Sequence, residues 1–189
     1  MTDHWDKLCL QSNAKVLVPL SGKSLDMHWL SQQGHTVTGI ELVEKAIIQF
    51  FQEWSTSPVQ ENRESGMRYS AERIHLYHAD FFTVEPDEMP FDAWYDRAAL
   101  VALPASLRHA YVEKLCSLVS VDAKGLMVTF DYPQEEMQGP PFALSDLEVD
   151  ALFSPYFNLE RLQFTDLTQE EERDLSRCSL SVFLLQRRK

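Results

Sequence analysis

The sequence predicts an α/β fold of the doubly wound, Rossmann-like class: one domain over residues 1–189, with a mostly parallel sheet and helices on both faces. Three observations lead to this prediction. Short apolar runs alternate with segments of helical periodicity along the chain. The apolar runs end in turns that carry glycine, proline or acidic residues. A 44% share of hydrophobic residues supplies a substantial core for a chain of 189 residues.

The first half of the chain contains three predicted strands separated by helices. Apolar residues recur at helical spacing over 42–54, which indicates the most regular helix of the chain. Residues 55–73 are polar, contain Pro58 and Gly66 and show no sustained period, so they predict a long connection. The predicted elements are strands over 15–20, 37–41 and 74–78 and helices over 24–32 and 42–54.

The second half continues the alternation and ends in a hairpin. Pro104 is typical of the first position of a helix, and Ser145 with Glu148 three residues later predicts a capped short helix. A loop with proline and glycine covers 132–142. The predicted elements are strands over 91–97 and 126–131, helices over 104–120 and 145–153, and two paired strands near 157–164 and 178–186.

Composition excludes several classes of function. The chain carries 17 Lys and Arg against 29 Asp and Glu, a formal net charge of −12, which repels nucleic acids and anionic membranes. Its apolar stretches are far shorter than the roughly 20 residues of a membrane-spanning helix. Cys9, Cys116 and Cys178 are widely separated, and the histidines show no metal spacing. We therefore expect a cytoplasmic monomer that binds no metal, nucleic acid or membrane.

The turn after the first strand contains Gly22-Lys23-Ser24, which matches the end of a phosphate-binding loop. The glycine that such a loop needs five positions earlier is Leu17, inside the strand, so a nucleotide triphosphatase is not indicated. Glu41 follows Gly22 by 19 residues, at the end of the second strand. A carboxylate there can accept hydrogen bonds from two ribose hydroxyls. This pair suits S-adenosylmethionine, a nucleoside cofactor without a pyrophosphate. Alternatively, Glu41 only begins the following helix.

Two further aspartates, each followed by a candidate binding residue, lie at predicted strand ends. Asp80-Phe81 offers a carboxylate for an adenine amino group beside an apolar face, or else a turn aspartate beside a core phenylalanine. Asp96-Arg97 places a cation at the mouth of a parallel strand, where it can bind the carboxylate of the cofactor or an anionic substrate. An internal ion pair between Asp96 and Arg97 is the alternative.

Four sequence runs, which include Glu41, Asp96 and Arg97, match a known family in their order and spacing. The chain resembles the thiopurine S-methyltransferases, within the class I S-adenosylmethionine-dependent methyltransferases. The resemblance implies a seven-stranded sheet with an antiparallel last strand, cofactor contacts from Leu20, Glu41, Asp80, Phe81 and Arg97, and a substrate pocket bordered by Arg97 and the loop 139–142. The matching runs are residues 18–24, 34–41, 96–102 and 139–142.

The chain also departs from the family pattern. Family members carry a longer N-terminal segment, with two tryptophans, that folds over cofactor and substrate as a lid. Residues 1–14 are interpreted here as a remnant of that lid, in which Trp5 matches one tryptophan and Cys9 stands where a second aromatic is expected. Ser21 replaces the usual cysteine and Ala98 a usual glycine, which are both exchanges between small residues.

The resemblance implies transfer of a methyl group from S-adenosylmethionine to a thiolate or similar soft nucleophile, with S-adenosylhomocysteine as product. Arg97 is the expected catalytic residue, because its charge favours the thiolate form of the substrate. Pro141, Phe142 and Tyr132 are expected to contact the substrate, and Phe142 and Trp5 to face the sulfonium. Two alternatives stay open: a module that binds the cofactor without turnover, and an enzyme that methylates halide, thiocyanate or a metalloid species.

Overall fold

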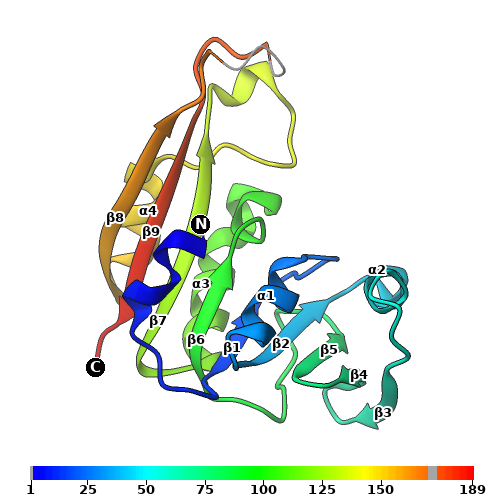
Figure 1. Ribbon diagram of the computed structural model, residues 1–189. Coiled ribbons are helices and arrows are strands. Elements are labelled where there is room, and N and C mark those ends of the chain that lie inside the picture. The colour runs from blue at the N-terminus through cyan, green and yellow to red at the C-terminus, as the bar shows by residue number, and fades with distance from the viewer. Residues whose placement is uncertain (1, 170–173) are drawn as a thin grey trace. The chain divides into compact units, whose positions relative to one another are not determined.

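The computed structural model describes residues 2–169 and 174–189 (Figure 1). The chain divides into two compact units. The first, called the β1–β6 unit, comprises Leu10–Tyr95 and Ser117–Ser120. The second, called the β7–β9 unit, comprises Met1–Cys9, Asp96–Cys116 and Val121–Lys189. The assignment of the whole chain to one domain stays a prediction.

The β1–β6 unit contains a mixed sheet with the strand order β3-β4-β5-β2-β1-β6. Its parallel part is formed by β1 between β2 and β6, and by β5 on the other side of β2. An antiparallel hairpin of β3 and β4 extends the sheet beyond β5. The strands are β1 (Lys15–Val18), β2 (Thr36–Glu41), β3 (Val59–Arg63), β4 (Gly66–Ala71), β5 (Ile74–His78) and β6 (Phe91–Asp96).

The hairpin corrects the sequence prediction, in which residues 55–73 were a long connection and the sheet had seven strands. The described residues form nine strands, and β3 and β4 are the two additional ones. β3 is an edge strand with partly or fully exposed residues throughout, so it lacks the apolar alternation of a half-buried strand. Gly66 begins β4 at φ 117°, and a Cβ there would lie 2.7 Å from the carbonyl oxygen of His78, so the close approach of β4 to β5 requires glycine.

Two helices pack against the parallel strands of this unit. Both α1 (Asp26–Gln32) and α2 (Glu44–Glu53) contact β2 and β5. The apolar stripe of α2 buries Ile47, Phe50 and Phe51, as the helical periodicity predicts. The predicted helices over 24–32 and 42–54 are therefore confirmed, apart from one or two residues at their ends.

The β7–β9 unit contains a three-stranded antiparallel sheet with the order β7-β9-β8. The last strand is antiparallel to both neighbours, as the resemblance implies, and the C-terminal hairpin is confirmed. β7 is longer than the predicted strand over 126–131. The elements are η1 (Thr2–Leu8), η2 (Leu100–Ala102), α3 (Ala105–Leu118), β7 (Val119–Asp131), η3 (Gln134–Glu136), α4 (Asp146–Phe153), β8 (Phe157–Asp166) and β9 (Ser179–Arg187).

The short segments η1 and α4 lie on opposite sides of the three-stranded sheet, with η1 in front and α4 behind in Figure 1. Two hydrogen bonds attach η1: His4 Nε2 lies 2.8 Å from Gln163 Oε1 in β8, and Lys124 Nζ in β7 donates to the Leu8 carbonyl at 3.0 Å. At α4, the Ser145 hydroxyl accepts from the Glu148 N–H at 3.3 Å, so the predicted cap is confirmed.

Within residues 2–169 and 174–189, no helix has the length and apolar character that crossing a bilayer requires. The same part of the chain contains no group of three or more His, Cys, Asp or Glu side chains arranged to hold a metal ion.

Candidate functional site

The turn after β1 bends back onto β2 and forms the first part of a candidate site. Leu20 has φ 43° and Gly22 has φ 52°, both in the left-handed region that a sharp turn requires. The Ser21 N–H donates to the Ile40 carbonyl at 2.9 Å, which fixes the turn against β2. A Cβ on Gly39 would lie 2.7 Å from Ser21 Oγ, so only glycine at position 39 permits this close approach.

Glu41 ends β2 and directs its carboxylate toward this turn. One oxygen accepts from the Gly22 N–H at 2.8 Å, and the other accepts from the Val43 N–H at 2.7 Å. The side chain is half-buried, so these two bonds hold the carboxylate in one orientation. Each carboxylate oxygen keeps a second lone pair for a further donor. Because Glu41 also accepts from the Val43 N–H ahead of α2, a role at the start of this helix is compatible with a role in binding a ribose.

Asp80 and Phe81 follow β5 and lie beside the end of β2, because the Ala79 N–H donates to the Glu41 carbonyl at 3.1 Å. The Asp80 side chain is exposed, and its Oδ1 accepts from the Phe82 N–H at 2.9 Å. The ring of Phe81 is only 3% exposed, so it packs into the unit. The structure therefore brings Leu20, Gly22, Glu41 and Asp80 to one edge of the β1–β6 sheet.

The chemistry of this edge fits a ribonucleoside. The oriented Glu41 carboxylate can accept from vicinal sugar hydroxyls, and the exposed Asp80 carboxylate can accept from an exocyclic amine. Ser21 Oγ is buried and has no hydrogen-bond partner among the residues that the structure describes. No glycine-rich loop surrounds a polyphosphate here, since Gly22 is the single glycine of the turn.

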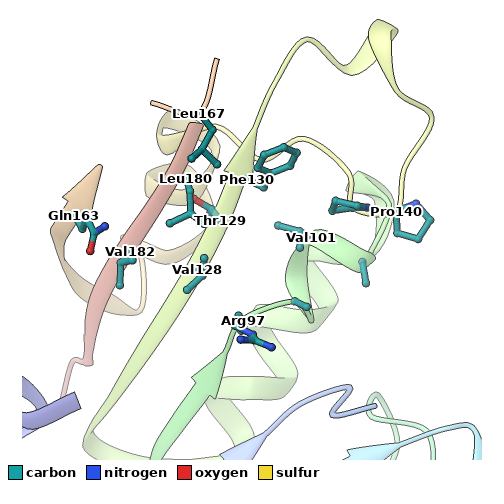
Figure 2. Close-up of a pocket in the computed structure, with 13 residues that line it drawn as sticks. Arg97, Val101, Val128, Thr129, Phe130, Pro140, Gln163, Leu167, Leu180 and Val182 are labelled. Carbon is teal, nitrogen blue, oxygen red and sulfur yellow. The ribbon is translucent and has the colours of Figure 1, made fainter. Parts of the chain in front are cut away.

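The β7–β9 unit contains a pocket of about 590 Å³ with mainly apolar walls. Figure 2 shows Arg97 at one end of this pocket and Leu167 at the other. The polar lining groups come from Arg97, Thr129 and Gln163. The apolar lining residues are Ala98, Val101, Ala102, Val128, Phe130, Pro140, Pro141, Leu167, Leu180 and Val182.

Strand register explains why these side chains converge. Val128 of β7 lies opposite Val182 of β9. Phe130 lies opposite Leu180 in the same pair of strands, and Gln163 of β8 also lies opposite Val182. Directly opposed residues of antiparallel strands project from the same face, so the three strands form one continuous pocket wall. The sequence predicts the pairing of β8 and β9 but not their pocket residues. The residues of one strand do not determine which residues of the next strand lie opposite them.

Arg97 is exposed and follows Asp96, which is 1% exposed. The Asp96 carboxylate accepts from the Ala99 N–H at 2.9 Å and from the Tyr111 hydroxyl at 2.7 Å. Burial raises the pKa of Asp96 above its usual range, against the lowering effect of these hydrogen bonds. Burial, with the neighbouring Asp96 carboxylate, also raises the pKa of Tyr111 well above its usual value, so the hydroxyl keeps its proton.

The loop after β7 forms another wall of the pocket, and Tyr132 anchors it. Tyr132 is 2% exposed, and its hydroxyl donates to the Pro141 carbonyl at 2.7 Å. It is not among the lining residues, whereas Pro141 is. Phe142 donates its N–H to the Val101 carbonyl at 2.6 Å and lines a second cavity of about 780 Å³. Trp5 lies in η1, is 4% exposed and lines neither cavity.

The fold is one that S-adenosylmethionine-dependent methyltransferases share. Solved structures with this fold include the 1,6-didemethyltoxoflavin-N1-methyltransferase of Burkholderia thailandensis with bound S-adenosylhomocysteine, at a TM-score of 0.64, 17% identity and coverage of 94% of this chain and 72% of that chain. Another is the YcgJ protein of Bacillus subtilis, at a TM-score of 0.71, 12% identity and coverage of 97% and 96%.

The family model described as thiopurine S-methyltransferase matches residues 1–188, and the chain belongs to this family. A thiopurine S-methyltransferase of Shewanella woodyi is 44% identical over 194 residues, covering 98% of this chain and 87% of the relative. One from Xanthomonas campestris pv. campestris is 40% identical over 189 residues, covering 97% and 87%. The protein is thus an S-adenosylmethionine-dependent methyltransferase, as the sequence predicts.

Proposed function

We propose that this protein transfers a methyl group to the sulfur of a small, largely apolar thiol bound in the pocket of the β7–β9 unit. The observation that carries the proposal is the combination of apolar walls with Arg97 at one end of a pocket of about 590 Å³. The names of the relatives support a sulfur acceptor. The proposed catalytic residue is Arg97.

The residues of the β1–β6 edge are proposed to hold the cofactor. Glu41 accepts from the ribose hydroxyls, Asp80 accepts from the adenine amino group, and the turn of Leu20 and Gly22 lies beside the rest of the molecule. When bound, S-adenosylmethionine supplies an electrophilic methyl group on a sulfonium. The positive charge of that sulfonium suits an aromatic neighbour, and Trp5 and Phe142 stay the proposed candidates.

The proposed part of Arg97 is to favour the nucleophilic form of the acceptor. A thiol becomes a much better nucleophile when it loses its proton, and a nearby cation lowers the pKa of a thiol. The proton of the thiol passes to solvent, and the guanidinium holds the resulting thiolate by charge and by hydrogen bonds. No covalent intermediate with the protein is required, because the leaving sulfide is already a good leaving group.

The apolar walls are proposed to contribute by positioning and by excluding water. Holding two reactants in line can lower a barrier by about 7–11 kcal/mol in favourable cases. Val128, Phe130 and Val182 remove water from the surroundings of the thiolate, which strengthens its interaction with Arg97. A flat, apolar thiol gains more from these walls than a small polar thiol, so thiophenol should be a better acceptor than 2-mercaptoethanol.

The proposal is tested by calorimetry with S-adenosylhomocysteine, followed by methylation assays with thiophenol and 2-mercaptoethanol. We expect binding of the nucleoside, formation of methyl phenyl sulfide, and a lower kcat/KM with 2-mercaptoethanol. Arg97→Ala should lower kcat/KM for thiophenol by about 10- to 100-fold, the range of one charged hydrogen bond. Because Arg97 is exposed, the same variant should melt within a few degrees of the wild type.

Different failures have different meanings. Binding without product from either thiol would favour a module that binds the cofactor without turnover. Product from iodide, thiocyanate or a metalloid oxyanion but not from thiols would assign another soft nucleophile. Unchanged kcat/KM in Arg97→Ala would remove Arg97 from the mechanism, and no binding of S-adenosylhomocysteine would contradict the whole assignment.

A further inference from the structure

The Asp96 carboxylate holds the beginning of the segment that carries Arg97. Asp96 accepts from the Ala99 N–H at 2.9 Å and from the Leu100 N–H at 3.3 Å with its Oδ1, and Oδ2 also accepts from Leu100 at 3.2 Å. These bonds close a tight loop around Arg97 and Ala98 and begin η2. The loop and η2 together supply Arg97, Ala98, Val101 and Ala102 to the pocket wall.

Tyr111 reaches this carboxylate from α3. Its hydroxyl donates to Asp96 Oδ2 at 2.7 Å, and its side chain is fully buried. A hydrogen bond from a hydroxyl to a carboxylate is short and strong, and in a buried site it cannot be replaced by water without rearrangement. The position of the Asp96 carboxylate, and with it the loop around Arg97, therefore depends on α3 as well as on β6.

We propose that Tyr111 is a positioning residue for the acceptor pocket: through Asp96 it fixes the backbone of Arg97 and so the direction of the guanidinium. This inference rests on the proposed function, because Arg97 is taken there as the group that holds the acceptor. Tyr111 is not among the residues that line the pocket. Its proposed influence on the reaction passes through Asp96 and the loop.

The chemistry of the contact explains why the hydroxyl, and not only the ring, matters. The ring fills space in the core, and phenylalanine fills nearly the same space. Without the hydroxyl, one lone pair of a buried carboxylate loses its donor, and the carboxylate must turn toward other donors. The N–H groups of Ala99 and Leu100 then move with it, which changes the loop that carries Arg97.

The test combines a double-mutant cycle with a structural signal. Tyr111→Phe, Arg97→Ala and the double variant are assayed for methylation of thiophenol. We expect Tyr111→Phe to lower kcat/KM by about tenfold, the order of loss that a small misplacement of a catalytic group causes. In the Arg97→Ala background the same change should have almost no further effect, because it acts through Arg97. Affinity for S-adenosylhomocysteine should stay within twofold of the wild type.

Tyr69→Phe is the matched control, because Tyr69 is also buried and donates to a carboxylate, that of Glu44, in the β1–β6 unit. The Nε–Hε signal of Arg97 in a ¹⁵N–¹H spectrum, assigned by its loss in Arg97→Lys, should move in Tyr111→Phe and not in Tyr69→Phe. Additive effects in the cycle, or an Arg97 signal that does not move, would overturn the inference. If the wild type methylates no thiol, the proposed function fails, and the Arg97 signal alone decides the positioning role.

Discussion

The carboxylate of Glu41 accepts a hydrogen bond from the Gly22 N–H at 2.8 Å, which joins the end of β2 to the turn after β1. Two segments that are far apart in the sequence thereby form one rigid corner of the candidate cofactor site. The second oxygen is held by the Val43 N–H at 2.7 Å. A group oriented in this way before ligand binding loses little entropy when it accepts further donors.

Glu41→Gln should weaken binding of S-adenosylhomocysteine by about 10- to 100-fold, which corresponds to the roughly 1.5–3 kcal/mol of hydrogen bonds to a charged group. The amide keeps one acceptor oxygen, while its NH₂ group turns a donor toward the Gly22 or Val43 N–H. Titration calorimetry measures the change. Glu53→Gln is the control, since Glu53 is exposed and pairs with Lys23 at 2.5 Å. Equal affinities in both variants would exclude a cofactor role for Glu41.

Tyr132→Phe should raise the KM for thiophenol several-fold and leave the affinity for S-adenosylhomocysteine unchanged. The variant loses the hydroxyl that donates to the Pro141 carbonyl at 2.7 Å, so the loop that forms one pocket wall is less well fixed. Steady-state kinetics and calorimetry separate the two effects. An unchanged KM for thiophenol would contradict this role of the Tyr132 hydroxyl.

The buried Asp96 should make the free energy of unfolding depend on pH. Because burial raises its pKa in the folded protein above the ordinary value of 3.8, the carboxyl contributes stability below about pH 3.8 that is lost as the pH rises through the folded-state pKa. Asn at this position does not titrate. The unfolding free energy of the wild type minus that of Asp96→Asn should therefore fall as the pH rises from 3.5 to 7. The fall amounts to about 1.4 kcal/mol for each tenfold difference in proton affinity of Asp96 between the folded and unfolded states.

Urea unfolding of both proteins across this pH range measures the difference. The comparison within a pair of variants cancels the opposite contribution of Glu61, Glu136 and Asp166, whose pKa values are lowered by hydrogen bonds. A difference that grows with pH would mean that the hydrogen bonds to Asp96 outweigh its burial.

The parallel strands were predictable because each is a buried apolar run with a turn signal at its end. Val16, Leu17 and Val18 are almost fully buried, and Glu41 directly follows the buried residues of β2. These patterns are local, so a single sequence contains them. The hairpin β3–β4 was not predictable in this way, because its edge strand is polar and is held by pairing with β4 rather than by an apolar face.

The candidate site divides in the same way. Gly22, Glu41 and Asp80 lie at strand ends, so topology alone places them along one edge. The pocket depends on which residues of β7, β8 and β9 face each other, and the bulge between Arg161 and Gln163 shifts that register by one residue. Such a shift moves side chains from one face of the sheet to the other, and the sequence of β8 contains no signal that predicts it.

Arg108 and Arg161 offer a comparison between a buried and an exposed ion pair in the β7–β9 unit. Arg108 pairs with Glu148 at 2.6 Å with only 3% of its side chain exposed, and it also donates to the Leu103 and Ala143 carbonyls. Arg161 pairs with Asp146 with 48% of its side chain exposed. Arg108→Met should lower the free energy of unfolding by about 2–4 kcal/mol, because it leaves buried acceptors without donors.

Arg161→Met should change the free energy of unfolding by less than about 1 kcal/mol, since solvent screens an exposed pair and its side chains are costly to order. Denaturant unfolding at neutral pH with and without 0.5 M sodium chloride measures both effects. Salt should reduce the small contribution of Arg161 and leave that of Arg108 nearly unchanged, because buried charges are poorly screened. Equal losses of unfolding free energy in the two variants would contradict this prediction. They would show that the hydrogen bonds from Arg108 to the Leu103 and Ala143 carbonyls add no stability beyond that of the ion pair.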